Sequence, residues 1–139
     1  MTTEEKIKIV RFRLNKAKET YEEACYLANG HKWNATVNRL YYACYYSVTA
    51  LLAWHEIKTK SHSGVRNRLG FHFVKTGIIN EKYAVFYSDI FDMRQASDYE
   101  DYLEYEKEDV LILLKPAEEF ILQMEHFIFN LIESTESCN

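Results

Sequence analysis

The sequence has little of what interrupts helices or builds a disulfide framework. One proline and four glycines occur in 139 residues, so few positions break a helix and long helices are expected. The three cysteines are an odd number, are widely spaced and form no CxxC pair, which indicates reduced thiols in a cytoplasmic protein. Cys25 and Cys44 fall on apolar helix faces, so we expect them to be small core residues, and Cys138 lies near the end of the chain.

Membrane and secretion signals are missing as well. No apolar run approaches the about 20 residues that span a bilayer, so no membrane segment is predicted. The N-terminal stretch "MTTEEKIKIV" is charged and lacks the apolar core of a signal peptide. We therefore expect a protein without a membrane partner.

Motifs for metals, nucleotides and nucleophiles are also absent. The five histidines form no HxxxH pair, and none follows a glutamate by three residues, so zinc and di-iron sites are not predicted. The sequence contains no Walker A loop, no GxGxxG and no GxSxG. The acidic run 98–109 lacks the glycine of a calcium-binding EF-hand loop. The sequence predicts no metal and no cofactor.

What the sequence does contain is helical periodicity throughout. Apolar residues are 47% and charged residues 27% of the chain, a globular balance, and the length suggests one domain over residues 1–139. Apolar side chains recur at alternating spacings of three and four, and no segment alternates with period two. We predict an all-α, antiparallel up-and-down bundle of about five helices. Their approximate ranges are 7–28, 33–55, 61–75, 81–97 and 106–133.

Signals at the ends of these segments agree with the periodicity. Gly30 and Gly77 stand where the first and third helices end, as C-caps do. Asn80 stands where the fourth helix begins and is a typical N-cap. Pro116 falls inside the last helix, and because it removes one backbone hydrogen bond, we expect a kink there.

Charge is distributed unevenly along the chain. Residues 1–75 carry 13 basic and 6 acidic side chains, a sum of +7, whereas residues 76–139 carry 4 and 15, a sum of −11. The densest runs are 57–80, with five basic residues and no acid, and 98–109, with seven acids and one lysine. Either the two regions lie against each other, within a chain or between chains of a dimer, or the basic run forms a groove for a polyanion.

The basic run contains the first candidate site, "KTKSHSGVRNRLGFH" at residues 58–72. If Ser61 or Ser63 begins the third helix, the free backbone N–H groups of the first turn form an anion site. Such a site suits phosphate on a nucleotide or on RNA. The alternative is a capped helix with a solvated basic face. The positively charged or titratable side chains that crowd this start are Lys58, Lys60, His62, Arg66 and Arg68.

The second candidate site is "MRQASDY" at residues 93–99. Arg94 and Asp98 are four residues apart on the fourth helix, so a local ion pair worth about 0.3–0.5 kcal/mol is one interpretation. The other places Arg94 in a cleft beside Arg39, since Arg39, Tyr42 and Tyr46 share one side of the second helix. Buried tyrosines need hydroxyl partners, and Asp98 would be one.

Three blocks in order carry a resemblance to a known family: "NRLYYACYYSVTALL", "KTKSHSGVRNRLGFHFVKTG" and "DIFDMRQASDYEDY". Over about residues 5–130 the chain resembles the HEPN domain (higher eukaryotes and prokaryotes nucleotide-binding), in its small stand-alone prokaryotic branch. The resemblance implies an all-α bundle that typically forms a homodimer. It also implies a frequent partner, a minimal nucleotidyltransferase, in a toxin–antitoxin pair. Active members of the family are metal-independent ribonucleases.

The chain departs from the ribonuclease pattern of that family, in which an arginine is followed after four to six residues by a histidine. Arg94 matches the arginine, but positions 99–101 read Tyr-Glu-Asp. Asp98 or Tyr99 would need a large pKa shift to transfer protons near neutral pH, a task that suits histidine. Arg66 and His72 match the spacing by letter only. They lie in the third helix, where six residues place them about 120° apart.

These observations lead to one main functional expectation and two alternatives. We expect a HEPN protein without catalytic activity that binds nucleotide, RNA or a partner nucleotidyltransferase, in a toxin–antitoxin-like module of a bacterial cell. The first alternative is a metal-independent ribonuclease toxin that uses Arg94. The second is a dimeric interaction module, without a nucleic-acid ligand, that assembles through its two oppositely charged regions.

Overall fold

The computed structural model describes residues 1–137 and shows helices and no strands in that part of the chain. Four long helices and one short helix confirm the predicted all-α class. The ends differ from the expected ones by a few residues, as is usual at helix termini. In chain order the elements are α1 (Thr3–Asn29), α2 (Trp33–Trp54), α3 (His62–Arg68), the π-helical η1 (Leu69–Val74), α4 (Glu81–Tyr99) and α5 (Lys107–Ser137).

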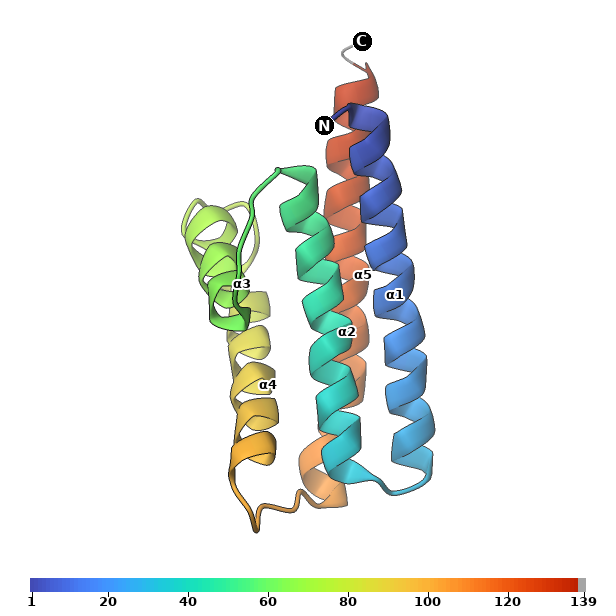
Figure 1. Ribbon diagram of the computed structural model, residues 1–139, viewed down its shortest axis with the longest axis vertical. Coiled ribbons are helices and arrows are strands. Elements are labelled where there is room, and N and C mark those ends of the chain that lie inside the picture. Colours follow the sequence, from blue (N-terminus) through green and yellow to red (C-terminus); the bar gives the residue numbers. More distant parts are fainter. Residues whose placement is uncertain (138–139) are drawn as a thin grey trace.

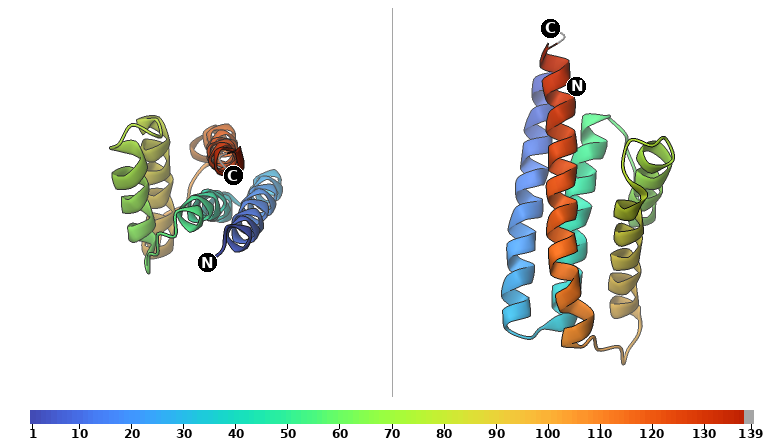
Figure 2. Two further views of the ribbon diagram at one scale, coloured as in Figure 1. Left: turned by 90° about the horizontal axis from the view of Figure 1, so that it is seen from above. Right: turned by 180° about the vertical axis from the view of Figure 1, so that it is seen from behind.

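The four long helices run alternately down and up along a common direction (Figure 1). Seen from above, α1 and α5 lie on one side of α2, and the pair of α3 and α4 lies on the other (Figure 2). Helix α2 is therefore the central element and contacts α1, α4 and α5. The predicted antiparallel bundle is confirmed, and α3 follows α2 and precedes α4 in the chain.

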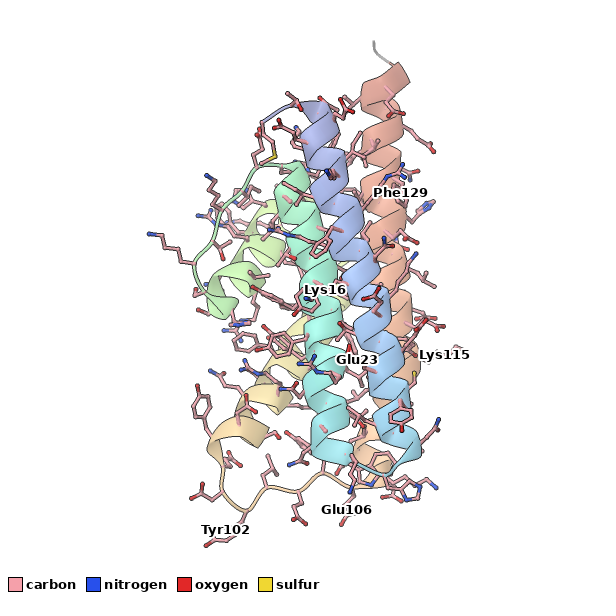
Figure 3. All side chains as sticks on the ribbon, turned by 45° about the vertical axis from the view of Figure 1, so that its right-hand side comes forward. Lys16, Glu23, Tyr102, Glu106, Lys115 and Phe129 are labelled. Atoms are coloured by element: carbon pink, nitrogen blue, oxygen red, sulfur yellow. The ribbon has the colours of Figure 1, made fainter. Side chains whose placement is uncertain are left out.

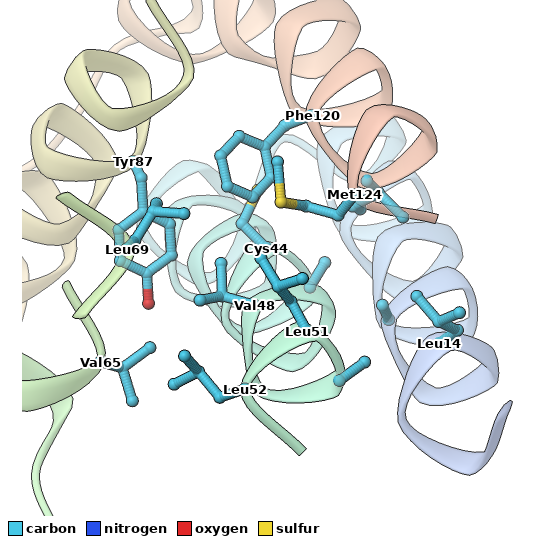
Figure 4. Close-up of a cluster of buried hydrophobic side chains, with 14 of the residues drawn as sticks. Leu14, Cys44, Val48, Leu51, Leu52, Val65, Leu69, Tyr87, Phe120 and Met124 are labelled. Atoms are coloured by element: carbon cyan, nitrogen blue, oxygen red, sulfur yellow. The ribbon is translucent and has the colours of Figure 1, made fainter. Parts of the chain in front are cut away.

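Helix α2 is central because its apolar and aromatic residues extend beyond a single stripe. Such a helix must be covered on more than one side. Phe120 and Met124 of α5 pack toward Cys44 and Val48 of α2, and all four side chains are fully buried (Figure 4). The core thus lies along the length of α2.

The cysteines are free thiols where the structure describes them. Cys44 is fully buried, and burial raises the pKa of its thiol, so this part of the core prediction is confirmed. Cys25 is half-buried on α1. Cys138 lies outside the described residues.

Most of the predicted caps are present, with one shift. The Asn80 side chain accepts a hydrogen bond from the Lys82 N–H at 2.9 Å, as an N-cap should. Gly30 follows α1, but its φ is −89°, and the left-handed residue is the next one, His31, with a φ of 57°. Gly77, with a φ of 80°, ends the segment after η1 and needs glycine's freedom.

The helical segment expected over residues 61–75 is present, but its second half is not an α-helix. Only His62–Arg68 is α-helical, and Leu69–Val74 winds with the wider π-helical turn. The change begins beside Gly70, a weak helix former. Leu69 and Phe73 are both buried in this segment, so packing of these side chains offsets the poorer backbone geometry.

Helix α5 continues through Pro116 without a break. Proline has no N–H, so the carbonyl of Ile112 loses its helical partner, and Ile112 is exposed. In the same turn, the Tyr21 hydroxyl of α1 donates to the Leu114 carbonyl at 2.8 Å. The first turns of α5 lean away from the line of the rest, as expected of a proline kink (Figure 2).

The acidic loop between α4 and α5 is tied to the bundle by two side chains. Asn34 of α2 donates to the Leu103 carbonyl and accepts from the Tyr105 N–H, both at 2.8 Å. The Tyr105 hydroxyl donates to the Met93 carbonyl at 2.7 Å. The loop backbone therefore has fixed contacts to both α2 and α4.

Removing the Asn34 amide should destabilise the protein. In Asn34→Ala, the Leu103 carbonyl and the Tyr105 N–H both lose their partner, so we expect the free energy of unfolding to fall by about 1–3 kcal/mol in urea denaturation. Asn67→Ala, at an exposed position of α3, should stay within about 0.5 kcal/mol of the wild type. Equal stability of both variants would contradict a stabilising role of the two Asn34 hydrogen bonds.

The two densest charge runs lie at opposite ends of α4. The basic run 57–80 precedes this helix, and the acidic run 98–109 follows it (Figure 1). Two ion pairs join the halves of the chain, Lys18–Glu125 and Arg66–Asp92, but among residues 1–137 no ion pair joins the two runs. Direct pairing of the runs within one chain is therefore not seen, and pairing between two chains stays a prediction.

One structural observation concerns the expectation that the chain has no membrane segment. Among the described residues, none of the helices combines the length and the apolar character that crossing a bilayer requires.

Candidate functional site

Four tyrosines of α2 form an aromatic surface toward α3 and α4. The ring centroids are 5.2 Å apart for Tyr41 and Tyr42, 6.2 Å for Tyr42 and Tyr46, and 5.7 Å for Tyr45 and Tyr46. The spacing of four residues in "YYACYY" places Tyr41 beside Tyr45 and Tyr42 beside Tyr46, in two adjoining rows on the helix surface. Tyr41 is buried and the other three are half-buried, so this tyrosine ladder presents accessible rings.

Cationic side chains from three helices lie over the tyrosine ladder. Each is within the distance at which the ring quadrupole attracts a cation, an interaction worth about 0.5–2 kcal/mol. One comes from α1, across the face of α2 (Figure 3), one from α2 itself and one from α4. Lys16 is 5.3 Å from the Tyr46 centroid, Arg39 is 5.1 Å from that of Tyr42, and Arg94 is 5.3 and 5.4 Å from those of Tyr41 and Tyr42.

Arg94 is both an ion-pair partner and a member of this surface. Its Nη2 lies 3.0 Å from Asp98 Oδ2, which is the local pair that the spacing predicted. Its side chain is only 16% exposed, and its buried Nε has no hydrogen-bond partner among the described residues. An unpaired buried donor costs about 1–3 kcal/mol, so such donors call for an explanation, and an acceptor on a ligand is one.

His62, the first residue of α3, lies against the same rings. Its Nδ1 is 2.8 Å from the Tyr41 hydroxyl, and its ring centroid is 4.6 Å from that of Tyr45. Burial and the charge of Arg94 lower the pKa of His62, which favours the neutral imidazole near pH 7. Burial also raises the pKa of Tyr41 to about 12, so this hydroxyl stays protonated.

The backbone turn that positions His62 is fixed by Ser61. The Ser61 side chain accepts from the Gly64 N–H at 2.9 Å and so acts as the predicted N-cap. Gly64 packs tightly here, because a Cβ at this position would lie 2.9 Å from Ser61 Oγ and 3.1 Å from Thr59 Oγ1. The start of α3 is therefore closely packed around Gly64.

Arg66, one turn after His62, extends the cationic surface along α4. Its guanidinium lies 4.2 Å from the Phe91 ring centroid, and its Nη1 is 3.4 Å from Asp92 Oδ1. The fold thus brings together Arg39, His62, Arg66, Arg94 and Asp98 from the residues that the sequence singled out.

Other candidates lie outside this group. Lys60 and Ser63 are exposed, and Ser63 Oγ is 3.3 Å from Ser61 Oγ. Ser61 already binds the Gly64 and Val65 N–H groups, and α3 has only seven residues. The phosphate site expected at the start of this helix stays a prediction that no further contact supports.

The remaining two candidates, Arg68 and Tyr99, also lie outside this group. The Arg68 guanidinium lies 3.0 Å from His72 Nε2, and Arg68 is exposed. Arg66 contacts Phe91 and Asp92 instead, so the Arg66–His72 spacing does not correspond to a contact between these residues. Tyr99 is 77% exposed, and no hydrogen bond or ring contact joins it to Arg94 within residues 1–137.

A shallow pocket adjoins the Arg94–Asp98 pair at the lower end of the surface. Its volume is about 340 Å³, and Asn38, Arg39, Ser97 and Asp98 are among the residues that line it. A larger hollow of about 560 Å³ is lined by residues of α1 and α5. These two helices lie on the other side of α2 from α3 and α4 (Figure 2). That hollow contains none of the candidate residues, so the smaller pocket is the one relevant to the site.

The sequence analysis named only part of this aromatic and cationic group. In the part of the chain that the structure describes, no three His, Cys, Asp or Glu side chains lie close enough together to share a metal ion. The sequence analysis missed Lys16, Tyr41, Tyr45 and Phe91. The doubled tyrosines of "YYACYY" were the available signal for two of them, whereas the places of Lys16 and Phe91 depend on packing between helices.

The fold and the site define an α-helical domain with a cationic and aromatic surface centred on an arginine near the end of α4. The family profile of the HEPN domain matches residues 10–127, which is most of the chain. The chain therefore belongs to the HEPN-domain family, and the resemblance seen in the sequence is confirmed.

Several known proteins are similar to the chain over most of its length. A "UPF0332 protein" of Thermotoga maritima is 35% identical over 127 residues, which cover 91% of this chain and 96% of the relative. "Putative toxin MJ0142" of Methanocaldococcus jannaschii is 29% identical, over 84% of this chain and 80% of the relative. "Putative toxin MJ0605" of the same organism is 30% identical, over 81% and 78%. The chain is thus similar, over more than four-fifths of its length, to two proteins that are named "Putative toxin".

Proposed function

We propose that this protein binds RNA through the tyrosine ladder and the cations above it. The observation that carries the proposal is Arg94, whose guanidinium lies over two rings and keeps an unpaired buried Nε. Guanidinium groups bind phosphate oxygens, and tyrosine rings stack on unpaired bases. A single-stranded RNA offers both partners in alternation.

A polymer fits this surface better than a single nucleotide. Arg39 and Tyr46 are seven residues apart on α2, so the ladder together with Arg39 extends about 10 Å along the helix axis. Lys16 and Arg66 widen the charged surface on either side. Mononucleotide sites are usually enclosed, whereas the pocket beside Asp98 is shallow. These features support RNA, with a free nucleotide as a weaker competitor.

The names of the relatives support a biological setting for this binding. Two of them are named "Putative toxin", so we infer that this protein acts in a toxin–antitoxin-like module in the cytoplasm. A minimal nucleotidyltransferase or a second copy of the chain is the partner that the HEPN resemblance implies. The acidic run 98–109, with Tyr99 and Tyr102 exposed, offers an uncovered surface for such a partner (Figure 3).

The binding proposal is tested by comparing Arg66 with Arg68. Both belong to α3, and replacing either with alanine removes the same charge, but only Arg66 contacts the site. We expect Arg66→Ala to weaken binding about five- to tenfold and to lower the salt slope by about 1, in fluorescence anisotropy with single-stranded 2′-O-methyl RNA. Arg68→Ala should change the affinity less than twofold.

Two outcomes would count against this proposal. Equal weakening in the two variants would indicate a general effect of charge rather than a defined surface. A wild-type protein that binds no 2′-O-methyl RNA at about 0.1 M salt would overturn the proposal. Competition with a mononucleotide in the same assay separates a polymer site from a nucleotide site.

A further inference from the structure

We infer that the shallow pocket beside the Arg94–Asp98 pair selects a guanine base of the bound RNA, and that the Asp98 carboxylate recognises this base. The inference rests on the proposed RNA binding and deepens it, because it names the base that the strand presents next to Arg94. It also gives a ligand to a pocket that the binding of phosphates and stacked bases leaves empty.

The pocket adjoins the tyrosine ladder through two of its lining residues, Arg39 and Asp98. The Arg39 guanidinium lies 5.1 Å from the Tyr42 ring centroid. Asp98 Oδ2 lies 3.0 Å from Arg94 Nη2, and the Arg94 guanidinium lies 5.4 Å from the same Tyr42 centroid. The pocket therefore begins where the ladder ends, and a strand that stacks on the ladder has its neighbouring base at the pocket.

The lining of the pocket combines apolar walls with polar groups. Leu27 of α1 and Ala35 of α2 are apolar, whereas Asn38, Ser97 and Asp98 carry hydrogen-bonding atoms. The volume of about 340 Å³ is at the small end of the about 300–1,000 Å³ that ligand pockets occupy. Such a pocket suits one flat base better than a complete nucleotide.

Two side chains keep free hydrogen-bonding atoms in this pocket. Asp98 Oδ2 binds Arg94, but Oδ1 has no hydrogen-bond partner within residues 1–137. Asn38 Oδ1 accepts from Arg39 Nε and Nη2 at 3.1 and 2.9 Å, which leaves the Asn38 Nδ2 group as a donor. Asn34, by contrast, uses both ends of its amide on the acidic loop. The pocket thus presents a carboxylate acceptor and an amide donor.

This pair of groups matches the Watson–Crick edge of guanine. Guanine has two adjacent donors there, N1–H and the 2-amino group, and a carboxylate accepts two such bonds side by side. The O6 acceptor next to them suits the Asn38 Nδ2 donor. Adenine, cytosine and uracil each place an acceptor beside the donor on this edge, and that acceptor would face a carboxylate oxygen. The pocket therefore favours guanine and disfavours the other three bases.

Arg94 links base recognition to backbone binding. Its Nη2 holds the Asp98 carboxylate, and an oxygen that accepts one hydrogen bond still has a lone pair for a second. Its buried Nε has no partner among the described residues and is free for a phosphate oxygen. Arg94 therefore keeps Asp98 in a fixed orientation while it binds the strand, and this preorganisation lowers the cost of recognising the base.

The test measures base preference rather than overall affinity. The reference strand is 2′-O-methyl oligouridine, which contains no guanine, and three further strands replace one central uridine with guanosine, adenosine or cytidine. In fluorescence anisotropy at about 0.1 M salt, we expect the wild type to bind the guanosine strand about 5- to 100-fold more tightly than the reference strand. The adenosine and cytidine strands should stay within about threefold of the reference.

An inosine strand separates recognition of guanine from stacking of a purine. Inosine lacks only the 2-amino group of guanosine, so one of the two donors to Asp98 is removed and the size of the ring system is kept. We expect the inosine strand to bind about three- to tenfold more weakly than the guanosine strand. Equal binding of the guanosine, inosine and adenosine strands would show that stacking alone causes the preference, and would overturn the inference.

Two substitutions test the atoms of the pocket. Asp98→Asn replaces one acceptor with a donor, so the preference for guanosine should fall below about twofold, while the guanine-free strand binds at least as tightly as to the wild type. Asn38→Asp keeps an acceptor for Arg39 but removes the Nδ2 donor, and should lower the preference about three- to tenfold. Because the readout is a ratio of two affinities, general effects of charge cancel.

The matched control is Asp101→Asn, the same change at an exposed position of the acidic loop that does not line the pocket. It should keep the wild-type preference for guanosine. Thermal unfolding verifies that each variant is folded. A loss of preference in Asp101→Asn equal to that in Asp98→Asn would assign the effect to acidic charge in general and would contradict the inference.

The results distinguish failure of this inference from failure of the proposed function. If the wild type binds the reference strand without preferring guanosine, or if Asp98→Asn keeps the preference, the recognition of guanine is wrong and RNA binding stands. A preference for adenosine or cytidine overturns the assignment to guanine. If guanosine monophosphate binds as tightly as the guanosine strand, the ligand is a free nucleotide and the RNA part is overturned. Absence of binding to every strand overturns both proposals.

Discussion

Replacing Phe120 with alanine is expected to lower the free energy of unfolding by about 3–5 kcal/mol. Phe120 of α5 is fully buried, and its ring centroid lies 6.1 Å from that of Tyr83, 6.2 Å from that of Phe86 and 5.7 Å from that of Tyr87 (Figure 4). These three rings belong to α4, so Phe120 connects the last helix to the helix that carries Arg94.

The effect is large because the loss has two parts. The truncated side chain no longer contributes its transfer from water, and the helices around it close the resulting cavity only in part. Urea denaturation of Phe120→Ala and wild type measures the difference. Phe12→Ala is the control, because Phe12 is 66% exposed and should cost less than about 0.5 kcal/mol. A loss below about 1 kcal/mol in Phe120→Ala would contradict the central place of this ring.

Replacing Arg94 with alanine is expected to weaken binding of 2′-O-methyl RNA by about 10- to 100-fold. A hydrogen bond to a charged group contributes about 1.5–3 kcal/mol, and Arg94 is mostly buried, so solvent screens it little. The substitution also removes the cation that lies over Tyr41 and Tyr42. Fluorescence anisotropy at fixed salt measures the change.

Two matched variants show whether the guanidinium shape matters. Arg94→Lys keeps the charge but loses the planar group that stacks on rings and donates through Nε, so we expect it to recover only part of the affinity. Asp98→Asn removes the ion-pair partner while it leaves Arg94 in place, and it should bind RNA at least as tightly as the wild type. Wild-type affinity in Arg94→Ala would show that the ligand does not reach this residue.

Much of the fold was predictable because it depends on local patterns. The apolar spacings of three and four that define α1, α2, α4 and α5 are a property of each segment, and so are the Asn80 and Ser61 caps. The π-helical turn at Leu69–Val74 was not predictable, because it depends on how Leu69 and Phe73 pack against other elements.

In the candidate site, too, local spacing was predictable and packing between helices was not. The Arg94–Asp98 pair follows from a spacing of four residues on one helix, and the tyrosine ladder follows from the doubled tyrosines of α2. The sequence by itself therefore determined the helices, the family and these two local groups. Only the tertiary structure placed His62 of α3 against the Tyr42 ring, which Arg94 also contacts, and Lys16 of α1 over the Tyr46 ring. These contacts join residues far apart in the chain, and their distances are set by how α1, α3 and α4 pack around α2, which no periodicity within a single helix specifies.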